Sequence, residues 1–293
     1  MAPGHPKHWQ IVQTHRLLKP IPDGWADPLA DWTIHLRAAG DAEGTIGTRT
    51  RHVSQAARGL RVPPNCVSST DLVTWCGTRA WKPETRHGYY TSLRGFFGWF
   101  STRCGTADPS TVLPAVRRPT PPPRPVPDEV LLEAIAQAAD RTRLMLYLAS
   151  CAGLRAGEIA VVHSGDIFTD LDGVSLLVHG KGSYERFVPL TDWLGHQLGS
   201  ACAEHGGYAF PGQIGGHLSA RWVSKLCSLA LPAPWTLHTA RHRFATCAYR
   251  LDHDILTVQR LLGHASVATT QRYAEPEREA LRATVRGVDL LNH

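Results

Sequence analysis

The sequence predicts a mainly α-helical protein of two domains that also contains a small β-hairpin or sheet. Three observations support this prediction. Apolar residues recur at helical spacing along 25–104, prolines crowd 105–127, and a single pair of alternating apolar segments interrupts an otherwise helical remainder. With 293 residues and 43% hydrophobic content, the chain is long enough to form two cores.

The charge is unevenly distributed along the chain. Residues 1–104 contain 13 Lys and Arg against 7 Asp and Glu, whereas residues 105–293 contain 18 of each. The net charge of +6 therefore lies in the amino-terminal third, which we expect to contact a polyanionic partner.

The cysteines and the apolar segments restrict the class of protein. The seven cysteines are odd in number and none is spaced as Cys-x-x-Cys, which argues against a disulfide framework or a zinc site. There is no signal-peptide pattern and no apolar run of membrane-spanning length. We therefore expect a soluble cytoplasmic protein that binds no metal and no membrane.

The first domain is expected to be entirely helical. Residues 1–24 contain four prolines and no periodicity, so we expect an extended amino-terminal arm. Within 25–104, a turn at 61–65 separates two amphipathic segments. Their apolar stripes consist of Val53, Ala56, Ala57 and Leu60 in the first segment, and of Tyr89, Leu93, Phe96, Phe97 and Phe100 in the second.

The proline-rich stretch at 105–127 is the predicted domain boundary, because such a composition favours a semi-rigid polyproline spacer. The second domain, 128–293, is predicted to be mostly helical. Two strands, 174–179 and 185–190, flank a glycine-containing turn. Helices are expected at 219–230, 238–250, 254–262 and 266–274, with a carboxy-terminal tail after Pro276.

Four places in the second domain carry residues suited to attack on a phosphodiester without a metal. That chemistry needs fixed cations for the phosphate, a positioned nucleophile and an acid for the leaving oxygen. Arg155 lies at a helix junction with Glu158 one turn away, and Lys181 lies at the tip of the predicted hairpin. Taken alone, these are more simply read as a surface ion pair and a solvated lysine.

The other two places lie on the carboxy-terminal helices. His238 and Arg241 are three residues apart and share a helix face. His264 is expected in a turn after Gly263, and Tyr273 two turns along the following helix. Taken alone, a polar helix surface and a half-buried core tyrosine explain these residues equally well or better.

In their order along the chain, these residues resemble the tyrosine recombinase (phage integrase) family. That family's pattern is Arg, a hairpin Lys, His-x-x-Arg, Leu-Gly-His, and a Tyr nine residues after that His, and all six positions are filled here. The stretches GLRAGE, HTARHRFAT and LLGHASVATTQRY carry the resemblance. It covers about 128–276 and, more loosely, 25–104, which is similar to the family's core-site DNA-binding domain.

Two departures qualify the resemblance. Arg243 stands where relatives often have a small hydroxyl residue, which gives no reason to expect a loss of activity. The arm at 1–24 is too short for a separate arm-site-binding domain, so the chain resembles a small integrase that lacks one.

The resemblance implies a role for each motif residue. Arg155 and Arg241 would clamp the scissile phosphate, and His264 would donate to a non-bridging oxygen. No cofactor is implied, because the phosphotyrosine intermediate conserves the energy of the broken bond. Glu158 would orient the first arginine or an adjacent helix.

The same resemblance assigns the nucleophile and the proton transfers. Tyr273 would attack the phosphate and form a 3′-phosphotyrosine bond. His238 would position the phosphate and accept the tyrosine proton, and Lys181 would protonate the departing 5′-hydroxyl.

The implied partners are double-stranded DNA core sites and three further copies of the chain, in a homotetrameric synapse that passes through a Holliday junction. The tail after Tyr273 would pack on a neighbouring subunit, and host or phage factors that bend DNA or control direction are further candidates. For DNA contact we nominate Arg86, Tyr90 and Arg94, spaced along one helix off its core stripe, and more weakly Arg51. A solvated helix face is an equally good interpretation of these four.

Three alternatives remain open from the sequence. A Xer-like resolvase or transposon recombinase would use the same chemistry, and a type IB topoisomerase has a related active site. A DNA-binding protein that has lost catalysis belongs to a different class, but the complete set of motif residues argues against it.

Overall fold

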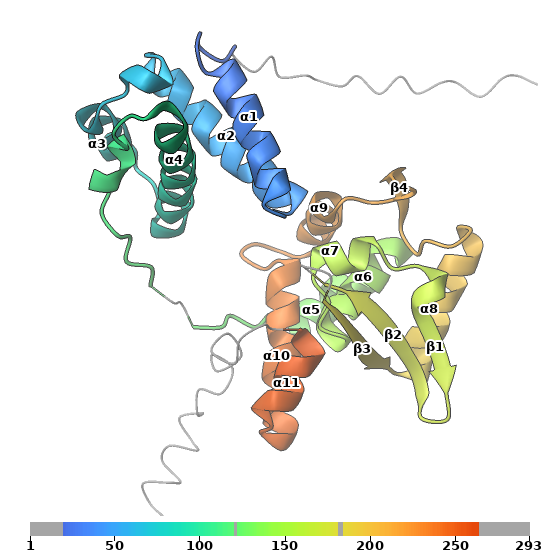
Figure 1. The fold of residues 1–293 in the computed structure, drawn as a ribbon. Helices are drawn as coiled ribbons and strands as arrows, with labels where there is room; N and C mark the ends of the chain where they lie inside the picture. The colour runs from blue at the N-terminus through green and yellow to red at the C-terminus, as the bar shows by residue number, and fades with distance from the viewer. Residues whose placement is uncertain (1–19, 120–121, 181–183, 264–293) are drawn as a thin grey trace, which may run out of the picture. The chain divides into compact units, whose positions relative to one another are not determined.

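The chain divides into two compact units, Met1–Thr120 and Pro121–His293 (Figure 1). The computed structural model describes residues 20–119, 122–180 and 184–263. Over these residues the predicted fold class is confirmed, since most of the structure is helical and one three-stranded antiparallel sheet is present. None of the helices in these ranges combines the length and apolarity needed to cross a bilayer.

The first unit is a group of helices with short connections. Its elements are α1 (Ala26–Ala38), α2 (Glu43–Leu60), the 3-10 turn η1 (Pro64–Cys66), α3 (Ser69–Gly77), α4 (Pro83–Cys104) and the 3-10 turn η2 (Pro109–Val112). Local sequence sets the helix ends. Ser68 and Asp71 form a capping box at the start of α3, and Gly105 ends α4 in the left-handed conformation at φ 65°.

An aromatic core holds the first unit together. Both predicted apolar stripes face it, and Phe96 lies at its centre. The Phe96 ring stacks on Trp25 at a centroid distance of 5.4 Å and meets Trp32 edge-on at 5.4 Å. Such pairs add to the burial energy of rings that are already fully inaccessible.

Tyr90 corrects one expectation, because it belongs to this core. We expected its side chain to lie off the stripe, yet only 4% of the residue is exposed. The apolar surface of α4 is therefore wider than the predicted stripe, since helices α1, α2 and η2 all contact this helix.

The proline-rich stretch also differs from the expected spacer. Leu113 is buried in the first unit and Val116 packs against the same core. At the other end, Val126 is buried in the second unit, where its N–H donates to the carbonyl oxygen of Thr239 at 3.2 Å. Apolar residues among the prolines thus anchor both ends of the stretch to their own unit.

The second unit packs helices against a small sheet. Its elements are α5 (Asp128–Gln137), α6 (Asp140–Cys151), α7 (Ala156–Ala160), the 3-10 turn η3 (Ser164–Asp166), β1 (Ile167–Asp170), β2 (Gly173–His179), β3 (Glu185–Leu190), α8 (Asp192–Glu204), β4 (Pro211–Ile214), α9 (Ala220–Ala230), α10 (Leu237–Asp252) and α11 (Ile255–Leu262).

The predicted strand pair is present, and β1 extends it to the order β1-β2-β3. Leu176 pairs with Val188 on the inner face of the sheet. Helix α6 is the central helix, with Met145, Leu146 and Leu148 fully buried, and it contacts α7, α9 and α10. This packing brings the α6–α7 junction against the amino-terminal half of α10.

Candidate functional site

The site begins at the junction between α6 and α7. Gly153 turns the chain with φ 65°, and a Cβ built on it would lie 2.5 Å from Cδ1 of Phe244 on α10. The following Leu154 is fully buried, which fixes Arg155 at the start of α7. Only glycine can take this conformation so close to a neighbouring ring.

Arg155 and Glu158 form the ion pair that their spacing predicted. The Glu158 carboxylate accepts the backbone N–H of Arg155 at 2.8 Å and its Nη1 at 2.8 Å. The Glu158 side chain is only 4% exposed, whereas that of Arg155 is 41% exposed. The pair is therefore no ordinary surface bridge, and its arginine reaches solvent while its carboxylate does not.

Arg241 joins the same cluster from α10. Its side chain is 3% exposed, and its Nη1 lies 3.6 Å from the Glu158 carboxylate. Nη1 donates to the carbonyl oxygen of Gly153, and Nη2 donates to that of Leu262 at 2.7 Å. Arg241 thus joins the α6–α7 junction to the end of α11.

A third guanidinium, from Arg186 on β3, completes the cluster and was missed from the sequence. It forms two parallel bonds to Glu158, from Nη1 at 3.0 Å and from Nη2 at 2.9 Å, and its side chain is 5% exposed. A signal was present in the sequence. In strand 185–190, Arg186 has the same inward parity as Val188, so a charged residue occupies a core position.

The carboxy-terminal end of α11 collects these arginines. Gly263 ends the helix with φ 61°. The last carbonyls of a helix lack intrahelical donors and carry partial negative charge, which favours cations there. The donations are Arg186 Nε to Leu261 O at 2.8 Å, Arg241 Nη2 to Leu262 O at 2.7 Å, and Arg155 Nη2 to Gly263 O at 3.3 Å.

The charges around Glu158 keep its carboxylate ionised. Burial raises the pKa of Glu158, but bonds from Arg186 and from the Arg155 backbone, with the charges of Arg186 and Arg241, lower it further than burial raises it. Three guanidinium groups then face one carboxylate, so the cluster keeps positive charge for an anionic group such as a phosphodiester.

His238 lies at the start of α10, where a second histidine orients it. The backbone N–H of Arg124 donates to Nδ1 of His242 at 3.3 Å, so that nitrogen is the acceptor. Nε2 of His242 lies 3.0 Å from Nε2 of His238. The two rings, one helical turn apart on α10, thus form one hydrogen-bonded pair.

The described residues therefore contain half of the six motif positions. Arg155 and Arg241 come together at Glu158, and His238 lies one turn before Arg241 on α10. The other three positions, Lys181, His264 and Tyr273, lie outside the described residues, as do the arm up to residue 19 and the carboxy-terminal tail.

Arg243, the departure from the family pattern, contacts the start of α5. Arg243 donates from Nε to the Asp128 carboxylate at 2.5 Å, so it ties α10 to the start of α5. Within 20–119, 122–180 and 184–263, no three His, Cys, Asp or Glu side chains are grouped to hold a metal ion.

The nominated DNA-contact residues of the first unit are placed differently from one another. Arg51 is exposed and Arg86 is half-buried, with its Nη2 3.3 Å from the carbonyl oxygen of Arg79. Arg94 instead donates to the carbonyl oxygens of Leu113 and Pro114. It holds the proline-rich stretch against α4 while remaining exposed.

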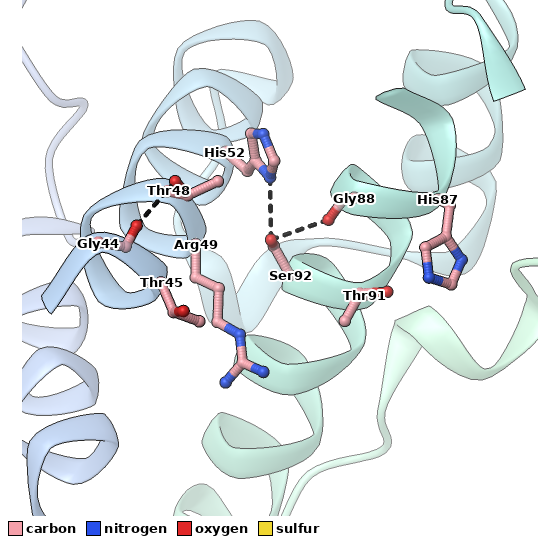
Figure 2. A pocket seen from close by; sticks show the side chains of 9 residues that line it. All are labelled: Gly44, Thr45, Thr48, Arg49, His52, His87, Gly88, Thr91 and Ser92. Atoms are coloured by element: carbon pink, nitrogen blue, oxygen red, sulfur yellow. Dashed lines mark hydrogen bonds between the residues drawn. The ribbon is translucent and has the colours of Figure 1, made fainter. Parts of the chain in front are cut away.

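A polar pocket of about 340 Å³ opens between α2 and α4 of the first unit (Figure 2). Figure 2 shows Nδ1 of His52 bonded at 3.0 Å to the hydroxyl of Ser92, which in turn donates to the carbonyl oxygen of Gly88 at 2.9 Å. Arg49 lines the pocket and pairs with Asp41 at 2.6 Å. The lining residues are Gly44, Thr45, Thr48, Arg49, His52, His87, Gly88, Thr91 and Ser92, none of which is acidic.

Comparison with known proteins agrees with this geometry. The profile described as the phage integrase family matches residues 128–279. The chain is 33% identical over 198 residues to tyrosine recombinase XerC of Xylella fastidiosa (strain 9a5c), covering 62% of this chain and 67% of that protein. It is 31% identical over 217 residues to tyrosine recombinase XerD of Ralstonia nicotianae, covering 66% and 69%.

The fold has solved counterparts. A lambda integrase dimer bound to a core site has a TM-score of 0.69 and 18% identity, covering 85% of this chain and 94% of that one. A post-cleavage complex of XerH recombinase has a TM-score of 0.64 and 20% identity, covering 82% and 78%. These likenesses concern the arrangement of helices and sheet.

Proposed function

The chain belongs to the phage integrase family, the tyrosine-type site-specific recombinases, and we propose that it cuts and rejoins DNA strands through a covalent bond to Tyr273. The observation that carries the proposal is the cluster in which Arg155 and Arg241 share the buried carboxylate of Glu158. This cluster concentrates positive charge beside the helix end that leads to His264 and Tyr273.

In the proposed reaction, Arg155 and Arg241 stabilise the phosphate as it becomes pentavalent. Arginine suits this role because its planar group donates to two phosphate oxygens at once. Arg155 is the more accessible of the two. His264 donates to a non-bridging oxygen. Fixed donors of this kind need no reorganisation as charge develops.

The covalent step exchanges one phosphoester for another. The hydroxyl oxygen of Tyr273 bonds to phosphorus, and the bond from phosphorus to the 5′-oxygen breaks. His238, which is hydrogen-bonded to His242, accepts the tyrosine proton on its imidazole. Lys181 gives a proton to the departing 5′-oxygen. A 5′-hydroxyl of another strand reverses these steps and releases the enzyme.

The two units divide the work in this proposal. Residues 25–104 form the core-site DNA-binding domain, residues 105–127 connect it to the catalytic domain at 128–293, and residues 1–24 are an arm. The basic excess of the amino-terminal third supplies the non-specific attraction to double-stranded DNA. Arg51, Arg86 and Arg94 are the nominated DNA contacts, and the polar pocket between α2 and α4 is a further candidate for contact with the DNA backbone. Tyr90 is buried in the core.

Assembly completes the proposal. Four subunits act on two DNA duplexes, the tail after Tyr273 packs on a neighbouring subunit, and DNA-bending or directionality factors assist. An integrase role in a bacterial cell fits the matching family. A resolvase role is the second candidate, because the curated relatives named above are XerC and XerD recombinases.

A selection on nicked DNA tests the reaction and defines its site. Purified protein is mixed with nicked duplexes that carry randomised half-sites, so that the short cleaved end diffuses away and the covalent complex is trapped. A DNA-linked band that survives denaturation supports the proposal, and sequencing the trapped DNA gives the core site. Tight, salt-sensitive DNA binding without such a band favours the non-catalytic alternative.

The selected site then separates the remaining alternatives. A resolvase excises the DNA segment between two sites placed in direct repeat on one plasmid. Recombination between sites on two different plasmids indicates integration. Relaxation of supercoiled plasmid without Holliday junctions or recombinants would indicate a topoisomerase.

A further inference from the structure

Arg186 is a buried member of the arginine cluster, and the proposed chemistry gives it no role. Its guanidinium donates to the protein itself, to both oxygens of Glu158 and to the carbonyl oxygen of Leu261. Its side chain is 5% exposed. Each of its three guanidinium nitrogens thus already donates to a protein oxygen.

We propose that Arg186 is a positioning residue that neutralises Glu158 and thereby leaves the charges of Arg155 and Arg241 available to the scissile phosphate. The proposal rests on the recombinase function proposed above. It assigns Arg186 no contact with the substrate.

The bond geometry supports this division of charge. Arg186 binds Glu158 through two parallel bonds of 3.0 and 2.9 Å, the strongest arrangement for these groups. Arg155 makes a single side-chain bond to the carboxylate, and Arg241 approaches only to 3.6 Å. Without Arg186, the buried carboxylate would draw both remaining guanidinium groups toward itself, because an unpaired buried charge is costly.

The position of Arg186 also connects the elements that carry the other predicted catalytic residues. It lies on β3, the strand that follows the hairpin with Lys181, and it bonds to the end of α11, which leads to His264. Gly263 makes room for it, because a Cβ on that residue would lie 2.8 Å from Arg186 Nη1.

The first test measures single-turnover formation of the covalent complex at saturating DNA, with the site found by the selection above. Arg186→Met is expected to slow this step by about 10–100-fold while DNA affinity stays within about 3-fold, as loss of an outer partner typically does. Adding Glu158→Gln removes the charge that Arg186 compensates, so the double variant should regain much of the lost rate. A merely structural residue would not show this recovery.

Arg143→Met is the matched control. Arg143 also donates to backbone carbonyls near a helix end, those of Ile135 and Ala138 at α5, and pairs with Asp140 at 2.9 Å. These partners lie outside the arginine cluster around Glu158. Its cleavage rate should equal that of the wild type. The proposal is overturned if folded Arg186→Met cleaves at the wild-type rate, or if the double variant is no faster than Arg186→Met.

A second comparison covers the case in which Arg186→Met fails to fold. Once Glu158 is neutral, Arg186 has no charge to compensate, so Glu158→Gln and the double variant should cleave at similar rates. A double variant slower than Glu158→Gln by about 10-fold or more would show an independent role and overturn the proposal.

A third measurement does not depend on cleavage at all. Sulfate, added at constant ionic strength as a probe for the phosphodiester, should stabilise the wild type against thermal unfolding at lower concentration than it stabilises Arg186→Met. The double variant should resemble the wild type. Equal sulfate midpoints for wild type and Arg186→Met contradict the charge division, whereas absence of a covalent complex from the wild type contradicts only the recombinase function.

Discussion

At the scale of single residues, Gly153 and Gly206 share a backbone conformation but differ in their surroundings. Comparing substitutions at the two positions distinguishes the cost of backbone strain from that of steric clash. Gly153 and Gly206 have φ of 65° and 70°, and both lie in the second unit. A Cβ at Gly153 would overlap the Phe244 ring at 2.5 Å, whereas a Cβ at Gly206 meets no described atom within 4 Å.

Alanine at the two glycines should therefore have unequal effects. Gly206→Ala carries the left-handed backbone cost alone, about 1 kcal/mol. Gly153→Ala adds overpacking against Phe244, for a total of roughly 2–4 kcal/mol. Thermal unfolding of the two variants measures the difference, and equal losses would contradict the described packing at the α6–α7 junction.

His179, at the end of β2, gives the second unit a pH-dependent contact. Its Nε2 lies 2.8 Å from Asp166 and its Nδ1 lies 3.0 Å from Glu185. The hydrogen bond with Asp166 is the largest cause that raises the pKa of His179, and the bond with Glu185 raises it further. Folding therefore favours the imidazolium.

The sign of the pH effect follows from that direction. The stabilisation is fully present below the unfolded pKa of about 6.5 and is lost as pH rises through the higher folded pKa. His179→Asn should thus cost more stability at pH 5.5 than at pH 9, measured by thermal unfolding. Glu185→Gln should show the same trend with a smaller amplitude, and a pH-independent loss for His179→Asn would contradict the contact.

At the scale of elements, helix α4 carries both residues that pack in the core of the first unit and residues that lie at its surface. Tyr90 lies in the core with 4% of the residue exposed. Arg86 is half-buried, and its Nη2 donates to the carbonyl oxygen of Arg79. The two residues were grouped from the sequence by spacing alone.

Alanine at these positions should give opposite phenotypes. Tyr90→Ala should destabilise the first unit by about 3–5 kcal/mol, as truncation of a buried aromatic ring does. If Arg86 contacts a phosphate, Arg86→Ala should leave stability nearly unchanged and reduce the slope of log affinity against log salt by about 1. Salt titrations of DNA binding measure the slope, and an unchanged slope would remove Arg86 from the interface.

Periodicity predicted the elements that present a regular apolar face to a core and missed several others. The stripes of α2 and α4 and the β2–β3 pair were predictable because each presents a regular apolar face to one core. Strand β1 has four residues and is mostly exposed, so it carries little apolar signal, and α8 was not predicted. The proline-rich stretch was read from its prolines, although Leu113 and Val126 decide where it packs.

The site was predictable only where residue type and spacing are local. Arg155 and Glu158 are one turn apart, so their pairing could be inferred. Arg186 is 28 residues from Glu158, and only the pairing of β3 with β2 and its packing against α11 bring it to the carboxylate. Long-range ion pairs of this kind depend on the complete fold.

At the scale of the whole molecule, attraction to DNA and chemistry are assigned to different parts of the chain. The net charge of +6 lies in residues 1–104, while residues 105–293 are balanced overall. In the second unit, positive charge is instead concentrated at one point, where three arginines face Glu158. Binding and cleavage should therefore respond separately to substitutions in the two units.

The most direct measurement identifies the residue that carries the DNA. The covalent complex trapped on nicked duplex is digested with trypsin, and the DNA-linked peptide is identified by mass spectrometry. Trypsin cuts after Arg272 and Arg278, which releases a peptide in which Tyr273 is the only hydroxyl side chain. We predict this peptide, joined to a 3′-phosphate, from the wild type and no adduct from Tyr273→Phe. Attachment at any other residue, or an adduct that persists in Tyr273→Phe, would contradict the proposed nucleophile.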